Sequence, residues 1–504
     1  MPKLTWSACA LALALISTPL GAAVAQGAPT SAPAPTPASA PPGAAAPLPL
    51  SLEDGHAIAG ALARGPGEGI ATPDISAALQ ALSSADGAAR GQADAAVSSA
   101  AIAFAGAEHG LRIEPQSVDH DWALRAAYDP AAEFAAARAA GRIGAWAEGL
   151  ARSDPSYRAL VAARWRYGAI VANGGWGQVP VGPTLKPPAP EAKPPKPAAP
   201  DAKPPKPPVE DARVPALRAR LTAEGYLMAP ADASDVYDTA LAAAVAAFQG
   251  RHALKADGVL TDATVQALNV PAEDRLAAID ANLERARWLP DPLPPQRIEV
   301  DISATEARLI SPGAPDLAMR AIVGDLKHHT PTLVSKVVAI VFNPPWVVPS
   351  SIAAAELYPK ERRHPGYFAA NGFSVVNGQL IQAAGPKAAL GLIKFEIPDP
   401  FSVYLHDTPS RSLFNREARW LSHGCVRVQR PRELAAALLA PQGWSRDDVD
   451  AAIAEDDTKR TPVTVQVPVF IIYRTAVADD QAQVTFRSDV YGWDAELEAA
   501  LNRH

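Results

Sequence analysis

Apolar residues in the first part of the chain recur at the three- and four-residue spacing of amphipathic helices. From residue 74 to about residue 172 the sequence is rich in alanine, and the spacing predicts helices within 132–152 and 155–171. The aromatic residues of this region suggest a small helical domain: Trp122, Tyr128, Phe134, Trp146, Tyr157, Trp165 and Tyr167. The histidines of this part of the chain are scattered and are expected to be ordinary surface or core residues: His56, His109 and His120.

Residues 209–271 contain three shorter stretches of helical spacing and are predicted to form a compact unit. The apolar positions of each stretch fall on one helical face: Val214, Leu217 and Leu221; Leu241, Val245 and Phe248; Val265 and Leu268. A turn over 256–260 separates the last two stretches, and Pro271 closes the unit because proline cannot continue a helix. A further helix is predicted over 272–288.

Beyond that helix the pattern changes from helical spacing to short runs of β-branched and apolar residues. Such runs are typical of strands and occur at 297–302, 307–310, 336–342, 392–397, 402–406 and 463–473. The last part of the chain is therefore predicted to be a mainly β domain. Together the patterns predict a multidomain protein, with helical units before the β domain.

Proline clusters and the N-terminus mark segments that cannot build a core. Residues 1–25 have Lys3, a short apolar run and the ending Ala23-Val24-Ala25, which is the pattern of a secretory signal peptide. Residues 26–50 are rich in alanine and proline and are expected to be a disordered tether. Residues 186–208 contain the sequence AKPPKP twice, which predicts an extended, solvated linker.

The charge and the lengths of the apolar runs indicate which partners and which location to expect. The net charge of −7 becomes −8 when the signal segment and its Lys3 are removed, and no basic stripe indicates a nucleic-acid partner. The apolar run of the signal segment is shorter than the ~20 residues that span a bilayer, and no other stretch is long enough. We therefore expect an exported protein whose mature chain has no integral membrane segment.

Cys425 is the only cysteine outside the predicted signal segment, since the other is Cys9. A single thiol cannot form an internal disulfide, so it is either a reactive group or a small buried residue. It lies in the run Ser-His-Gly-Cys-Val-Arg, between His423 and Arg427, and cationic neighbours favour a thiolate. We therefore predict that Cys425 is a nucleophile.

A partner for this thiol lies 19 residues earlier in the sequence. Alternation along 401–406 places His406 with Tyr404 on the polar face of a strand, at the open rim of a sheet. A cysteine nucleophile needs a base and backbone N–H groups that bind an oxyanion, and His406 and the turn at Gly424 could supply them. No zinc-ligand spacing is present, and we expect neither a metal nor another cofactor.

These residues carry a family resemblance. The stretch YLHDTPSRSLFNREARWLSHGCVRV (residues 404–428) resembles the catalytic motif of the L,D-transpeptidase (YkuD) family, and residues 342–350, 384–395 and 405–409 are similar to its YcbB-like subgroup. The pattern over 209–271 resembles the three-helix peptidoglycan-binding domain. The resemblance implies a helical scaffold at 51–185, a catalytic domain of β-sandwich type at 272–476 with a flap at about 350–390, and a C-terminal extension at 477–504.

The resemblance also implies the chemistry. Cys425 would be the nucleophile, His406 the general base and acid, His423 and Gly424 the oxyanion turn, and Arg427 the motif cation, with either a structural or a carboxylate-binding role. Two further residues are candidate site walls, with ordinary packing as the alternative: Tyr404 and Ser422. A periplasmic enzyme of this kind would form 3→3 cross-links between peptidoglycan stem peptides, and carbapenems would acylate its thiol.

Alternatives remain open from sequence. Water as the acceptor would give an L,D-carboxypeptidase, and a protein lysine would give lipoprotein attachment. The same two residues could also serve another cysteine peptidase that acts on peptidoglycan. Without catalysis, the chain would be a wall-binding protein. The resemblance leaves room for partners among cell-wall synthesis proteins. The chain departs from the subgroup in its Lys/Pro linker, in the run at 381–384 and in a short span between Ser351 and Gly385, so gating and drug sensitivity are expected to differ more than the chemistry.

Overall fold

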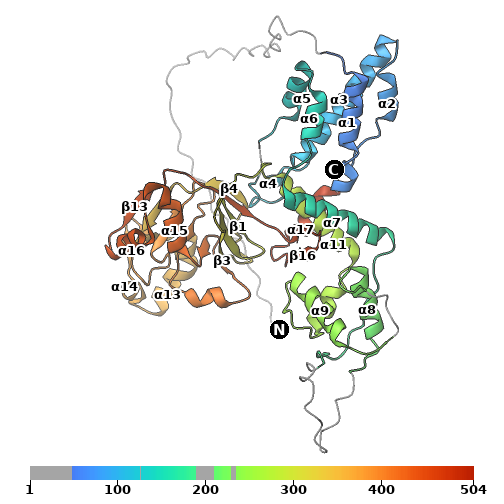
Figure 1. The fold of residues 1–504 in the computed structure, drawn as a ribbon. Coiled ribbons are helices and arrows are strands. Elements are labelled where there is room, and N and C mark those ends of the chain that lie inside the picture. The colour runs from blue at the N-terminus through green and yellow to red at the C-terminus, as the bar shows by residue number, and fades with distance from the viewer. Residues whose placement is uncertain (1–47, 125–126, 189–208, 229–233, 504) are drawn as a thin grey trace, which may run out of the picture. The chain divides into compact units, whose positions relative to one another are not determined.

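The computed structural model describes residues 48–124, 127–188, 209–228 and 234–503 (Figure 1). The predicted signal segment, most of the tether and most of the Lys/Pro linker lie outside the described residues. The tether prediction is wrong at its end, because Leu50 is buried in the helical core and its N–H donates to Asp94 at 2.8 Å. Ordered structure therefore begins before residue 51.

The first region is helical, as predicted. Its helices are α1 Leu52–Leu62, α2 Ser76–Ala81, α3 Gly87–Glu108, α4 Pro115–Val118, α5 Pro130–Ala139, α6 Ile143–Gly149 and α7 Pro155–Ala172. Helix α7 confirms the prediction over 155–171. The helical spacing over 132–152 belongs to two helices and not to one, because Gly141 adopts a left-handed φ of 60° and separates α5 from α6.

The predicted three-helix unit is present. Its helices are α8 Val214–Ala223, α9 Thr239–Arg251 and α10 Asp262–Leu268, and the apolar residues that predicted them are almost fully buried in one cluster. Asp238 and Thr261 cap α9 and α10 by accepting backbone N–H groups of the first turn. The pattern of apolar residues therefore identified the core of this unit correctly.

The last region is built on an 11-stranded sheet, which confirms a mainly β domain. The strands run in the order β13-β5-β9-β10-β12-β3-β2-β1-β14-β4, and β11 also pairs with β3. Their bounds are β1 Arg297–Asp301, β2 Glu306–Ile310, β3 Leu317–Gly324, β4 Leu333–Lys336, β5 Ala339–Phe342, β9 Ile393–Glu396, β10 Leu405–His406, β11 Trp420–Ser422, β12 Val426–Val428, β13 Lys459–Pro462 and β14 Pro468–Ile472.

Three predicted strands differ from the structure. The run 336–342 is divided between β4 and β5, and 463–473 forms a strand only over β14. The run 402–406 is a strand only at its last two residues, because Ser402 has a left-handed φ of 59°. This break separates the catalytic-motif strand β10 from the loop before it.

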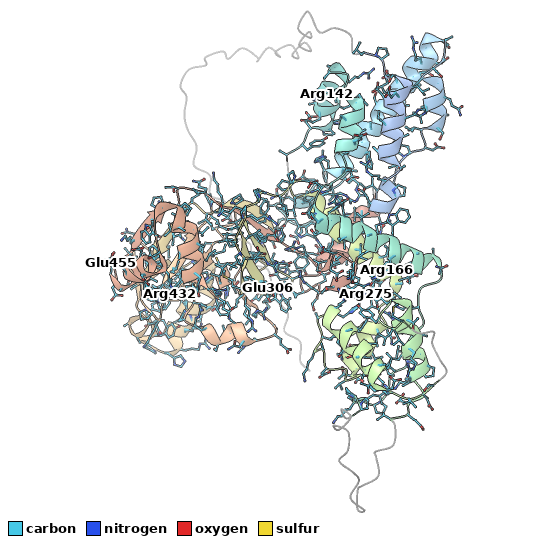
Figure 2. The ribbon with its side chains drawn as sticks, in the orientation of Figure 1. Arg142, Arg166, Arg275, Glu306, Arg432 and Glu455 are labelled. Atoms are coloured by element: carbon cyan, nitrogen blue, oxygen red, sulfur yellow. The ribbon has the colours of Figure 1, made fainter. Side chains whose placement is uncertain are left out.

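Helices complete the core around the sheet. They are α11 Ala272–Arg287, α15 Pro431–Leu439, α16 Arg446–Ala454 and α17 Trp493–Leu501. Apolar residues of α15 and α16 enter the main core, while charged side chains such as Arg432 cover their solvent side (Figure 2). Trp493 and Leu497 also belong to this core, so the segment predicted as a C-terminal extension packs as part of the domain.

The predicted flap has a small core of its own. It contains α12 Ser350–Ile352, a π-helical turn over Ala353–Leu357, α13 Tyr358–Arg363 and α14 Tyr367–Ala370. The strands β7 Phe373–Val376 and β8 Gln379–Gln382 follow; β8 pairs with β7 on one side and with β6 Trp346–Val347 on the other. Val348, Leu357 and Phe373 bury their side chains against one another. Single π-helical turns occur often at functional sites.

Candidate active site

Three neighbouring strands bring the predicted site residues to one face of the sheet. Strand β10 lies between β9 and β12, and Leu405 is opposite Phe395 and Val426. All three of these side chains are fully buried in the core. Because side chains alternate along a strand, the residues next to them project from the other face.

The other face carries five polar or reactive side chains. His406 is paired with Lys394 on one side and with Arg427 on the other, so the three form a row across the strands. One step back along the strands, Tyr404 lies beside Cys425, and the N–H of Val426 donates to the Tyr404 carbonyl at 3.0 Å. The sheet therefore brings His406, Tyr404 and Arg427 to the surroundings of the thiol.

The turn before Cys425 is held by Ser422. The Ser422 hydroxyl donates to the carbonyl of Cys425 at 2.6 Å and accepts the N–H of Gly424 at 3.2 Å. Gly424 has a left-handed φ of 105°, and a Cβ there would lie 3.1 Å from the carbonyl oxygen of His329. Ser422 is nearly fully buried, so it shapes the turn and does not line the site as a wall.

Only part of the expected oxyanion turn is available. The N–H of Gly424 is occupied by Ser422, whereas that of Cys425 has no acceptor among the described residues. The N–H of Cys425 is therefore the one backbone donor of this turn that an oxyanion beside the thiol could bind. The prediction that N–H groups of both residues converge on the oxyanion is not met in this arrangement.

Burial governs the protonation of Cys425. Desolvation raises the pKa of its thiol, while the backbone N–H and phenol of Tyr404, and then the charge of Lys394, act to lower it. The expectation that cationic neighbours leave a thiolate is therefore wrong for the protein alone, since burial is the larger effect. Lys394, for which the sequence predicted no role, acts on the thiol together with Arg427.

The Tyr404 phenol is placed to donate a hydrogen bond to the Cys425 sulfur when that sulfur is charged. Burial and the neighbouring Cys425 raise the pKa of its phenol, so it remains protonated, and the Trp346 side chain lowers that pKa by hydrogen bonding to the phenol. The Lys394 ammonium lies 4.4 Å from the centre of the Tyr404 ring. Trp346 is therefore a further site residue at the base of the flap, and it entered the sequence analysis only through the resembling run at 342–346.

Tyr404→Phe is expected to slow alkylation of Cys425 by iodoacetamide at pH 7 by up to about tenfold, because a hydrogen bond to a charged group is lost. The pKa of the Cys425 thiol would rise, so the pH dependence of the alkylation rate would shift to higher pH. Tyr358→Phe is the matched control, since no hydrogen bond of its hydroxyl occurs among the described residues. An unchanged profile in Tyr404→Phe would contradict the role of the phenol.

His406 is buried, with 4% of its surface exposed, so the prediction that it lies on an open rim is wrong. Its Nδ1 donates to the backbone carbonyl of Asp407 at 2.6 Å, which leaves the lone pair on Nε2. Burial, with the positive charge of Arg427, lowers the pKa of His406 to about 3. The ring is therefore neutral and carries a lone pair, as a base requires.

The thiol and the imidazole are not in hydrogen-bond contact in the described residues. Sγ of Cys425 lies instead 4.0 Å from the carbonyl oxygen of Ser402. Catalytic contacts are often long in an unliganded site and shorten when substrate binds. The arrangement brings the two groups to adjacent strands on one face, and their assignment as nucleophile and base stays a prediction.

His423 faces the flap and not the thiol. Its Nε2 lies 2.6 Å from a carboxylate oxygen of Glu356, in the π-helical turn, and its ring lies 4.6 Å from the ring of His328. His328 in turn contacts Asp325 at 3.0 Å. His423 thus joins the catalytic turn to the flap. The sequence analysis missed Glu356, since no local pattern links residues 67 positions apart.

Glu356→Ala is expected to increase amide hydrogen exchange over 353–363, because the contact between the flap and His423 is removed. An exposed control is Glu455→Ala, just after α16, whose carboxylate pairs only with Lys459 at the start of β13 among the described residues. Hydrogen-exchange mass spectrometry compares the exchange of these amides in both variants and in the unaltered protein. Equal protection of the flap in all three proteins would contradict this role for Glu356.

Among the described residues, one group could offer three ligands to a metal ion, and it lies outside this face: Asp119, Asp121 and His329. His329 contacts Asp121 at 3.3 Å, and Asp119 accepts the Trp493 indole N–H at 2.9 Å. These side chains therefore already have protein partners. They carry no role in the chemistry considered below.

Comparison with known families identifies the class of each region. Residues 295–465 match the YkuD family, described as "L,D-transpeptidase catalytic domain". Residues 210–268 match "Putative peptidoglycan binding domain", and residues 51–163 match "Scaffold domain". The chain therefore combines a YkuD L,D-transpeptidase catalytic domain with a peptidoglycan-binding domain and a Scaffold domain.

A curated relative agrees with this assignment. A protein of Haemophilus influenzae described as "Putative L,D-transpeptidase" is 33% identical over 240 residues, which is 44% of this chain and 48% of the relative. The chain thus spans about half the length of that relative. Within the described residues, no helix is both long and apolar enough to cross a bilayer.

Solved structures were also compared. An L,D-transpeptidase from Xylanimonas cellulosilytica matches at 16% identity and a TM-score of 0.16, covering 53% of this chain and all of that one. An L,D-transpeptidase from Stackebrandtia nassauensis matches at 12% identity and a TM-score of 0.19, covering 51% and 88%. Superpositions this poor carry no argument, and the assignment rests on the family matches.

Proposed function

We propose that this protein is a periplasmic L,D-transpeptidase that joins peptidoglycan stem peptides through a thioester on Cys425. The observation that carries the proposal is the common sheet face of Cys425 and His406, inside the segment that matches the L,D-transpeptidase catalytic domain. Cys425 is also the only cysteine among the described residues. The predicted signal segment and the peptidoglycan-binding domain support a location where the cell wall is built.

Three groups act together in the proposed acylation step. Nε2 of His406 accepts the Sγ proton as sulfur attacks the carbonyl carbon of the third stem residue, and the Cys425 N–H donates to the oxyanion. The C–N bond to the terminal D-alanine then breaks, and the leaving amine takes the proton from His406. The Tyr404 phenol stabilises the sulfur while it carries negative charge.

Deacylation repeats the same proton transfers in reverse. The side-chain amine of a second stem peptide attacks the thioester, His406 accepts its proton, and the thiol takes that proton as the C–S bond breaks. The product is a 3→3 cross-link. The peptidoglycan-binding unit would hold the glycan near the site and raise the local concentration of stems.

The test is a reaction of the purified protein with a disaccharide-tetrapeptide, followed by mass spectrometry of the products. The proposal expects a cross-linked dimer with release of one D-alanine per link. Release of D-alanine with only a disaccharide-tripeptide would make the protein an L,D-carboxypeptidase. Intact substrate, with a thiol that alkylating reagents still modify, would contradict the proposal.

A further inference from the structure

Two cations beside the thiol have no acidic partner. Lys394 and Arg427 flank His406 in the row described above, and neither forms an ion pair within the described residues. Nε of Arg427 is buried without a hydrogen-bond partner, and both side chains are partly buried. Buried charges in folded proteins are normally paired, so an anion is expected to bind at this face when the thiol is protonated.

The nearest carboxylates in the sequence are already in use. Glu396, two residues from Lys394 on β9, pairs with Arg460 at 2.8 Å. Asp399 accepts the backbone N–H groups of Phe401 and Val403 at 2.7 and 3.1 Å. Asp407 accepts the N–H of Leu392 and pairs with Arg411, both at 3.0 Å. None of these acids neutralises the row. The Cys425 thiolate interacts with both cations, but burial favours the protonated thiol in the free protein. While the thiol is protonated, the anion has to come from a ligand.

We propose that Lys394 and Arg427 form a clamp for the free carboxylate of the residue that follows the scissile bond in the acyl-donor peptide. The proposal rests on the function proposed above and names the group that this site recognises. It assigns Lys394, to which the earlier analysis gave no role, to substrate binding. It also resolves the two readings of Arg427 in favour of contact with the substrate.

The spacing of the sheet fits this occupant. Residues two apart on one strand are separated by about 6.6 Å, which is the offset between the row of Cys425 and the row of Lys394 and Arg427. In a peptide, the next carboxyl carbon lies no more than about 4 Å from the attacked carbonyl carbon, and sulfur approaches that carbon to about 3 Å. A terminal carboxylate one residue beyond the attacked bond therefore reaches the clamp.

Occupation of the clamp would also prepare the base. In the free protein, the charges of Arg427 and Lys394 oppose protonation of His406. A carboxylate bound between them offsets both charges and favours the imidazolium that forms as sulfur attacks. The base would thus become effective only when a peptide with a free terminus is bound.

The test compares a disaccharide-tetrapeptide that ends in a carboxylate with the same peptide ending in a carboxamide. The unaltered protein is expected to prefer the acid about tenfold to hundredfold in kcat/KM, as for loss of a hydrogen bond to a charged group. Lys394→Met and Arg427→Gln are expected to reduce this preference to about threefold or less. The acid and the amide are compared on the same sample of each variant. A fraction of unfolded protein lowers both values of kcat/KM equally and leaves their ratio unchanged.

Lys336→Met is the matched control, since Lys336 is exposed on β4 at the far edge of the sheet. It should retain the full preference. A second experiment measures the binding of both peptides to Cys425→Ala by calorimetry. The acid is expected to bind more tightly than the amide, and the double variant Cys425→Ala, Lys394→Met is expected to lose this difference. Equal binding of the acid and the amide would contradict the clamp, even if the protein processed neither peptide. Tighter binding of the acid without any turnover would contradict the proposed function and leave the clamp standing.

Discussion

Replacing Cys425 by alanine is expected to abolish the covalent adduct that a carbapenem such as meropenem forms with the protein. The side chain is the only thiol in the described residues, and the Ser422 turn presents it beside the free N–H of its own residue. Turnover of a disaccharide-tetrapeptide is expected to fall at least about 10³-fold, because no other group there can form the thioester.

Intact-protein mass spectrometry checks this prediction. The unaltered protein should gain the mass of one carbapenem, and Cys425→Ala should gain none. Lys336→Met should behave as the unaltered protein does. An adduct that persists in Cys425→Ala would move the nucleophile elsewhere, and no adduct on either protein would remove the support for a reactive thiol.

Replacing His406 by asparagine is expected to slow acylation of Cys425 by about 10² to 10⁴-fold, which is the usual contribution of a general base. Asparagine is chosen because its amide can replace Nδ1 as donor to the Asp407 carbonyl while it offers no basic nitrogen. The thiol itself is retained, so the loss would report the missing base.

Stopped-flow measurement of acylation by meropenem gives the rate for each protein. His120→Asn is the matched control, since 89% of the His120 side chain is exposed. Circular dichroism melts separate a chemical effect from unfolding, because His406 is buried. A folded His406→Asn variant that is acylated within a factor of ten of the normal rate would contradict its role as the base.

The parts of the fold that the sequence predicted are those set by local periodicity. The three helices of the peptidoglycan-binding unit bury the residues that their spacing marked, and α7 buries Tyr157 and Tyr167 but leaves Trp165 exposed. The failures lie where a single backbone angle decides the outcome. Left-handed conformations at Gly141 and Ser402 ended a helix and a strand that the pattern continued.

The site was predictable only in outline. The motif around Cys425 drew attention to residues close in sequence, and His406 was found by alternation along a short strand. The groups that set the electrostatics come from other strands and from the flap, namely Lys394, Trp346 and Glu356. Burial of His406 also depends on this tertiary packing, and a pattern within one strand could not reveal it.

The position of the C-terminal segment shows the same limit. Residues 477–504 follow the last predicted strand, and nothing in their local pattern ties them to the sheet. In the structure Trp493 lies 4.8 Å from the ring of Tyr473 and packs with Leu497 in the main core. Contacts between segments this far apart follow from the fold as a whole, and local spacing does not encode them.

The most direct test of the account is rapid-quench mass spectrometry of the protein mixed with a disaccharide-tetrapeptide. The account predicts a transient species heavier by the disaccharide-tripeptide acyl group, located on the peptide that contains Cys425, with one D-alanine released. Cys425→Ala should show neither the species nor the release. Release of D-alanine from the unaltered protein without any acyl group on Cys425 would contradict the central claim.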